Sequence, residues 1–175
     1  LYHGPRNDLP EGYNPKAVIE KINNLDNITI VRGNCDADVD QMVIKHPIES
    51  PFVHKTIGNI SVLMDHGYTK SREELLNQAR ELSVDILILG HTHVKELSIE
   101  HDVIVLNPGS TAIPKDGTHS VATIEILNEQ SHDDFELEIN LIDINTKEVI
   151  EIDECDCGCG DHSHNGHCHD DHCHC

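Results

Sequence analysis

The sequence predicts a layered α/β domain, because short apolar strands alternate with amphipathic helices and polar residues follow the strands. Aromatic residues make up only 3% of the chain, so the core has to be built from Val, Ile and Leu, which favour strands. Near-continuous apolar strands are typical of a sheet that is covered on both faces. Strands mixed with helices then give an α/β domain in layers.

Two segments carry the start signals of helices. Residues 14–25 begin with Asn14 at the N-cap and Pro15 at the first helical position. Residues 71–82 begin with the capping-box pair Ser71 and Glu74. Because apolar residues then recur at helical spacing in both segments, we expect two amphipathic helices.

Four segments are expected to be buried strands that end in polar residues. Each has an apolar run followed by Gly, Asn, Asp or His, and together they cover residues 27–36, 59–67, 85–93 and 102–110. Two later strands, 121–127 and 135–144, alternate more openly and lack that polar ending. We expect the four polar ends to meet along one edge of the sheet, where α/β folds build their sites.

The composition argues against two classes of partner, nucleic-acid duplexes and membranes. The formal net charge of −20 argues against binding to a nucleic-acid duplex, which needs clustered Lys and Arg. No apolar run of about 18 residues is present, so no membrane span is predicted. Six of the seven Cys lie in the last part of the chain and only Cys35 lies in the body, which indicates a reducing compartment, the cytoplasm, and metal binding instead of a disulfide framework.

The two imidazoles of His91 and His93 follow a predicted strand directly, and His66 ends another. Paired histidines at a strand end are typical of metal ligands, although spacing alone leaves surface histidines as an equal alternative. Asn34 adds an amide oxygen from a third strand end. Nitrogen and oxygen donors without paired cysteines fit Mn²⁺, Fe, Ni²⁺ or Zn²⁺ better than a structural thiolate site.

Three motifs of the sequence resemble those of one protein family. GNCD at 33–36, HG at 66–67 and GHTH at 90–93 are similar, in order and spacing, to the motifs of calcineurin-like metallophosphoesterases. Residues 1–15, 31–42 and 107–115 look like the small bacterial one-domain phosphodiesterase branch. The resemblance covers about residues 1–150.

The resemblance implies a layered αββα sandwich that hydrolyses phosphoesters, most simply phosphodiesters, at a dinuclear metal centre with a bridging hydroxide. Asn34, His66 and His91 would bind one ion, and His93 would bind the other. Mn²⁺ is the favoured metal, with Ni²⁺, Fe and Zn²⁺ as alternatives. The expected partner is a small phosphoester; no membrane is expected, and a homo-oligomer is left open.

The chain departs from the family pattern in three places. The family's Asp-x-His and Gly-Asp motifs would precede Leu1, so we interpret the chain as N-terminally truncated and inactive by itself, with the activity belonging to its intact parent. Many members have His where this chain has Cys35, which makes Cys35 a candidate catalytic residue and His3 a candidate substitute for the missing His. Tyr68 stands where relatives often have another His.

The last residues form a separate segment in this interpretation. Residues 1–150 are assigned to the metallophosphoesterase domain, and 151–175 to a disordered tail rich in Cys, His and Asp. Thiolates and imidazoles select Zn²⁺, Ni²⁺ or Cu(I), in several exchangeable arrangements. The candidate tail ligands are Cys155, Cys157, Cys159, His162, His164, His167, Cys168, His169, His172, Cys173, His174 and Cys175.

The tail supports an alternative function. In this alternative the protein stores or delivers metal through the tail and the body is inactive. A third interpretation is a tail that binds metal only because it is rich in His.

The remaining polar features receive plainer interpretations. The acidic segment 36–40 lacks the Gly and Glu of a calcium loop, so it is expected to be a solvated loop or a brace for the turn at Asn34. The other histidines follow no ligand spacing and are expected at the surface: His46, His54, His101, His119 and His132.

Overall fold

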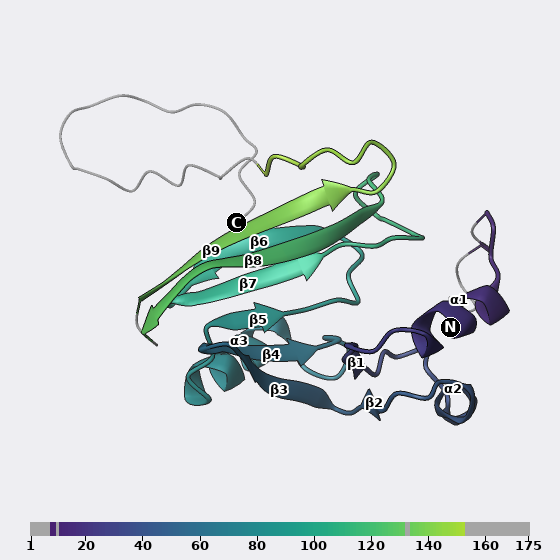
Figure 1. Ribbon diagram of the computed structural model, residues 1–175, viewed down its shortest axis with the longest axis horizontal. Helices are drawn as coiled ribbons and strands as arrows, with labels where there is room; N and C mark the ends of the chain where they lie inside the picture. The colour runs from purple at the N-terminus through teal and green to yellow at the C-terminus, as the bar shows by residue number, and fades with distance from the viewer. Residues whose placement is uncertain (1–7, 10, 132–133, 153–175) are drawn as a thin grey trace, which may run out of the picture.

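A five-stranded sheet lies at the centre of the fold (Figure 1). The structure, a computed structural model, describes residues 8–9, 11–131 and 134–152. The strand order is β3-β4-β5-β7-β6. The strands are β3 (Phe52–Ile57), β4 (Ile60–Asp65), β5 (Ile86–Ile88), β6 (Lys95–Glu100) and β7 (Val103–Pro108).

The three inner strands are parallel and in register. Met64 of β4 pairs with Ile88 of β5, which in turn pairs with Leu106 of β7. The two outer strands, β3 and β6, run antiparallel to their neighbours. The carboxyl ends of β4, β5 and β7 therefore stop at the same edge of the sheet.

Helix α3 (Arg72–Glu81) covers one face of the sheet. Its apolar stripe is buried together with the inward side chains of the inner strands, among them Leu63, Leu87 and Val105, which are no more than 1% exposed. Each such side chain contributes about 1.5–3 kcal/mol by leaving water. The helix begins at a capping box, in which Ser71 Oγ accepts from Glu74 N, as its sequence predicts.

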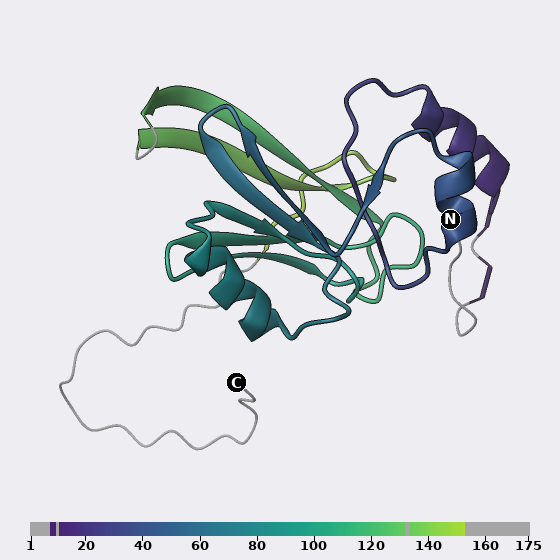
Figure 2. The same ribbon diagram turned by 90° about the horizontal axis from the view of Figure 1, so that it is seen from below.

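A second sheet covers the opposite face. It is the hairpin of β8 (Ser120–Ser131) and β9 (Asp134–Asp143), from which Ile126 and Leu137 pack against Ile86 and its neighbours. Figures 1 and 2 show α3 and this hairpin on opposite sides of the central strands. The predicted α/β layering, with a sheet covered on both faces, is confirmed.

The remaining elements form a group at the other end of the molecule (Figure 2). They are α1 (Pro15–Asn23), α2 (Asp38–Val43) and the short parallel strands β1 (Ile30–Val31) and β2 (Ile48–Glu49). Asn23 joins the two helices, because its Nδ2 donates to Val43 O at 2.9 Å and its Oδ1 accepts from Lys45 N at 2.7 Å. No described helix has the length and apolarity that crossing a membrane requires.

The structure corrects several expectations about single elements. Residues 36–40 form no open loop, because Asp40 Oδ2 accepts from Ala37 N at 2.8 Å and starts α2. The brace expected in the same segment is present, since Asp36 Oδ2 accepts from Gly33 N at 2.7 Å. Strands β2, β3 and β6 were not expected from the sequence, and only Ile30–Val31 of the run 27–36 is a strand.

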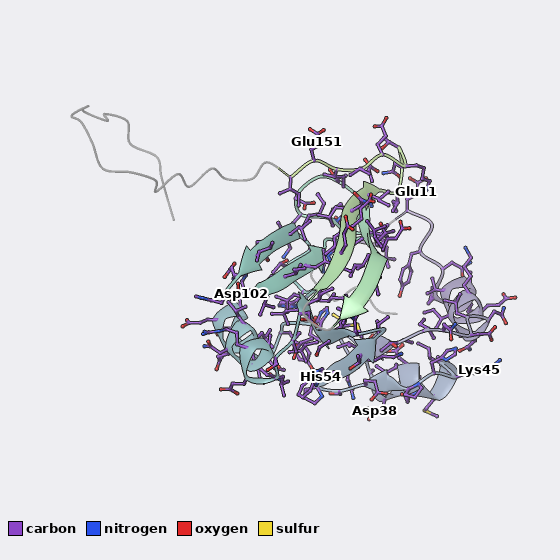
Figure 3. The ribbon with its side chains drawn as sticks, turned by 60° about the vertical axis from the view of Figure 1, so that its left-hand side comes forward. Glu11, Asp38, Lys45, His54, Asp102 and Glu151 are labelled. Atoms are coloured by element: carbon purple, nitrogen blue, oxygen red, sulfur yellow. The ribbon has the colours of Figure 1, made fainter. Side chains whose placement is uncertain are left out.

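Several charged side chains lie on the outside, among them those of Glu11, Asp38 and Asp102 (Figure 3). One group of them joins α3 to the edge strand β6. Arg72 Nε donates to Glu96 Oε1 at 3.0 Å, and its Nη1 donates to Glu100 Oε2 at 3.0 Å. The hydrogen bond from Arg72 lowers the pKa of Glu100 below its ordinary value of 4.5. Partial burial raises this pKa, but by less.

We predict that Arg72→Met lowers the free energy of unfolding at about pH 7 by no more than about 1 kcal/mol, because these ion pairs are partly exposed. The pKa of Glu100 is lower in the folded state than in the unfolded chain. Its contribution is therefore present above about pH 4.5 and is lost as the pH falls through the folded-state value.

Urea unfolding at about pH 7 and about pH 3 measures this difference. The exposed Arg80 in the last turn of α3 provides the control variant, Arg80→Met. An equal loss for Arg72→Met at both pH values would contradict the assignment.

Candidate functional site

Asn34 lies in the turn that follows β1. The turn is closed by Asp36, whose backbone N donates to Gly33 O at 3.2 Å while its Oδ2 accepts from Gly33 N. Arg32 Nη2 donates to Asp36 O at 3.1 Å and holds the same turn from outside. The carboxamide of Asn34 is thus presented by a rigid turn and not by a free loop.

His66 follows β4 directly and lies between two glycines. A Cβ atom at Gly33 would lie 3.3 Å from both Cε1 and Nε2 of the imidazole, and one at Gly90 would lie 3.1 Å from its Nδ1. Both distances are tighter than ordinary carbon contacts. The imidazole therefore fills the space that side chains at 33 and 90 would occupy.

His91 is placed by the loop after β5. Its φ of +67° lies in the left-handed region, which is unusual for a residue with a side chain. Asn107, only 2% exposed at the end of β7, supports this loop: its Nδ2 donates to Gly90 O at 3.1 Å and to Thr92 Oγ1 at 3.0 Å. Asn107 was not among the residues expected at the site, although it lies at the end of one of the four strands with polar endings.

The three side chains meet at one oxygen atom. Asn34 Oδ1 lies 2.9 Å from His66 Nε2 and 3.3 Å from His91 Nδ1. Ligand atoms that share a metal ion at about 2.0–2.1 Å lie roughly 2.8–3.4 Å apart in octahedral or tetrahedral geometry. Both separations, from Asn34 Oδ1 to His66 Nε2 and to His91 Nδ1, agree with that spacing.

The environment keeps His66 neutral. Burial, and then the neighbouring His91, lower the pKa of His66 below its ordinary value of 6.5, and these effects outweigh the opposite effect of Asp36. A metal ion binds the neutral imidazole, so the lowered pKa makes His66 available to a cation at neutral pH.

His93 lies beside this group but not in direct contact with Asn34. Its Nδ1 donates to Ile113 O at 3.0 Å, and its own carbonyl accepts from Lys115 N at 2.9 Å. A backbone carbonyl that binds one ring nitrogen fixes the tautomer and leaves Nε2 free to bind a metal. His66, His91 and His93 all border one cavity of about 550 Å³, which we call the histidine cavity.

The other candidate residues have varied placements. Cys35 is a free thiol whose Sγ accepts from Asn34 Nδ2 at 3.5 Å, and the ring of Tyr68 lies 5.8 Å from that of His66. Among residues 8–9, 11–131 and 134–152, no three His, Cys, Asp or Glu side chains could together hold a metal ion. The site near Asn34 has two imidazoles, and its third donor is an amide oxygen.

Some candidates lie outside the described residues: His3, His132 and every candidate ligand of the tail. Of the histidines expected at the surface, His54 and His101 are exposed. His119 and His46 are half-buried. His119 is partly covered because its Nδ1 donates to Thr111 O at 2.9 Å, within the fold.

Residues 109–117, which belong to the loop between β7 and β8, position His93. Lys95 and Asp116 hold one end of it, through Lys95 Nζ and Lys95 N, both 2.7 Å from Asp116 Oδ2. At the other end Gly109 has a φ of +82°, and a Cβ atom there would lie 2.4 Å from Ser120 Oγ. Only glycine fits that position, so the path of the loop is set where it leaves the sheet.

A model of a known protein family matches most of this chain. The model of the calcineurin-like phosphoesterase superfamily domain matches residues 8–129. That range contains Asn34, His66, His91 and His93, and it covers well over half of the chain.

Two curated relatives agree with this match. Phosphodiesterase YfcE of Escherichia coli (strain K12) is 39% identical over 142 residues, which cover 75% of this chain and 74% of the relative. The probable metallophosphoesterase YsnB of Bacillus subtilis is 28% identical over 113 residues, 60% of each chain. A solved structure of the E. coli phosphoesterase Yfce superimposes with a TM-score of 0.69 at 33% identity, covering 86% of this chain and 77% of that one.

We predict that Gly109→Ala lowers the free energy of unfolding by at least about 2 kcal/mol, because the new methyl group overlaps Ser120. Gly117→Ala is the matched control, since Gly117 has the same left-handed backbone, φ +83°, but nothing within 4 Å. It should cost only about 1 kcal/mol of backbone strain. Equal losses for the two variants in urea unfolding would show that the contact with Ser120 is unimportant.

Proposed function

Because this chain belongs to the calcineurin-like phosphoesterase superfamily, we propose that it hydrolyses phosphodiesters with divalent metal ions held at the edge of its central sheet. The observation that carries the proposal is the convergence of Asn34, His66 and His91 at metal-ligand spacing. This convergence is the geometry that a cation site needs, and it lies within the region matched by the family.

One ion would be held by Asn34 Oδ1, His66 Nε2 and His91 Nδ1, and a second by His93 Nε2. Mixed nitrogen and oxygen donors favour Mn²⁺, with Ni²⁺, Fe and Zn²⁺ as alternatives. Divalent ions at such a site lower the pKa of water and neutralise the charge of phosphoryl oxygens during in-line displacement.

Four residues that are not proposed ligands position the proposed ligands. The glycines at 33 and 90 let His66 lie close to Asn34, and Asn107 holds the loop of His91 in place. The carbonyl of Ile113 orients His93. The phosphoryl group would lie in the histidine cavity, which these imidazoles line.

Cys35 is our candidate for a contact to the phosphoryl group or the leaving group, because its thiol lies against the amide of Asn34. His3 is the second candidate, on the basis of the sequence. A thiol is a weaker general acid than an imidazole at neutral pH, so esters with good leaving groups are the preferred substrates.

We also propose the extent and the setting of the enzyme. Residues 1–150 form the catalytic domain and 151–175 a separate segment. The free thiol of Cys35 agrees with a reducing compartment, for which we propose the cytoplasm. The net charge of −20 favours small phosphoesters over nucleic-acid duplexes as substrates.

We predict that His91→Ala lowers Mn²⁺-dependent hydrolysis of bis(p-nitrophenyl) phosphate by the full-length protein at least about 100-fold, because one ion loses a ligand. Mn²⁺ binding, measured by calorimetry, should weaken in parallel. The exposed His101 provides the control variant His101→Ala, which should stay within about twofold of the wild type. Hydrolysis that persists in excess chelator would contradict a metal-dependent mechanism.

A second metal function is proposed for the alternating Cys and His of residues 155–175. These residues would bind Zn²⁺, Ni²⁺ or Cu(I) and supply metal to the catalytic site. The observation that favours it is the concentration of six of the seven Cys in this segment.

Deletion of residues 153–175 should remove most of the Zn²⁺ that the protein binds in equilibrium dialysis. Diester hydrolysis should then fall only when metal is scarce, because the catalytic site has its own ligands. Unchanged hydrolysis at every metal concentration would exclude the supply role. A storage protein with an inactive body would instead lack diester hydrolysis in both forms.

A further inference from the structure

A second cavity, of about 910 Å³, lies between the segment that leads into α1 and the loop that follows β7. Its volume is in the range of small-molecule sites, about 300–1,000 Å³. We call it the ester cavity. Of the four metal ligands proposed above, only His93 lines this cavity.

The ester cavity adjoins the histidine cavity. His93 and Thr111 line both of them, so the two spaces meet beside the imidazole proposed to bind the second ion. A substrate whose phosphorus lies near His66 and His91 can therefore extend one of its ester groups past His93.

The wall of the ester cavity holds exposed apolar side chains. On one side Tyr13 and Val18 are 39% and 44% exposed, and Leu9 is 62% exposed. Ile113 and Pro114 form the facing wall. Large apolar side chains that gather around a concave surface are typical of a ligand site, and an aromatic ring among them favours a flat apolar ligand.

The same wall is tied to the proposed metal ligand. Ile113, which faces Tyr13 and Val18 across the cavity, accepts the hydrogen bond from His93 Nδ1. A group bound between these walls thus contacts the loop that orients His93. The hydrogen bond between His93 Nδ1 and Ile113 O thus links binding in the ester cavity to the position of His93.

The charges of the cavity favour an uncharged group. Asp8 and Glu11 are exposed carboxylates in its lining (Figure 3 labels Glu11), and among the described residues of the lining only Lys115 is a Lys or Arg. A second phosphate would face these carboxylates and pay for like-charge repulsion. A neutral apolar group meets no such cost.

We propose that the ester cavity binds the bulky, uncharged and preferably aromatic alcohol group of a phosphodiester, and that it thereby sets the substrate class of the enzyme. The inference rests on the proposed function, because that function places the phosphoryl group beside His93. Tyr13 and Val18 are specificity residues in this proposal and do not take part in the chemical step.

Binding of two symmetrical diesters tests the proposal independently of which ester group leaves. Calorimetry with the Mn²⁺-loaded full-length protein should find diphenyl phosphate bound at least about tenfold more tightly than dimethyl phosphate, because a phenyl group buries apolar surface. Tyr13→Ala, and separately Val18→Ala, should reduce this ratio to about threefold or less while leaving dimethyl phosphate binding within about twofold.

Ile99→Ala is the matched control, since Ile99 is an apolar side chain that is 75% exposed on β6 and does not line the cavity. It should keep the wild-type ratio. A wild-type ratio near one, or a ratio that neither cavity variant changes, overturns the proposal.

The proposed hydrolysis and the proposed role of the ester cavity can be contradicted separately. A protein that hydrolyses diesters but binds both probes equally contradicts the ester cavity alone. A protein that prefers diphenyl phosphate in the same Tyr13-dependent manner but hydrolyses no diester with Mn²⁺ contradicts the proposed function and leaves the cavity assignment standing. Absence of binding for both probes overturns the ester cavity.

Discussion

The close fit of the His66 imidazole between two glycines is the constraint on which the site depends. Side chains at 33 or 90 would displace the ring by contact with its nitrogen atoms or with Cε1. With the ring in place, its Nε2 lies within hydrogen-bond distance of the carboxamide of Asn34, and the same oxygen reaches His91. Because positions 33 and 90 carry no side chains, the three donor atoms can lie close together.

The sheet determines where those donors can meet. The inner strands are parallel and their last paired residues are aligned, so His66, Gly90 and Asn107 lie at a common edge of the sheet. α3 and the β8–β9 hairpin bury the two faces and keep the strands in that register. The apolar core stabilises the fold, and the edge that it leaves uncovered holds the proposed metal ligands. The same division of roles is usual in α/β proteins.

The loop of residues 109–117 connects the two halves of the functional surface. It is tied to the sheet by Gly109 and by the pair of Lys95 and Asp116, and it supplies the carbonyl that orients His93. Its other side faces the segment that precedes α1. One loop therefore takes part both in positioning a proposed metal ligand and in forming the wall against which a substrate group would pack.

The sequence by itself determined the features that depend on near neighbours. Capping residues and helical spacing predicted α1 and α3, and apolar runs predicted β4, β5, β7, β8 and β9, because these patterns act within a few residues. The order of the motifs at 33–36, 66–67 and 90–93 indicated the family and the edge at which its polar residues gather.

Only the tertiary structure decided how those residues contact one another. The separation of Asn34 from His66 and His91 depends on strand register and on glycine contacts between segments far apart in the chain. The supporting role of Asn107, the bond from His93 to Ile113 and the cavity beside Tyr13 join distant segments in the same way. Such contacts leave no periodic signal in the sequence, because they arise from packing across the whole domain and not from local backbone preference.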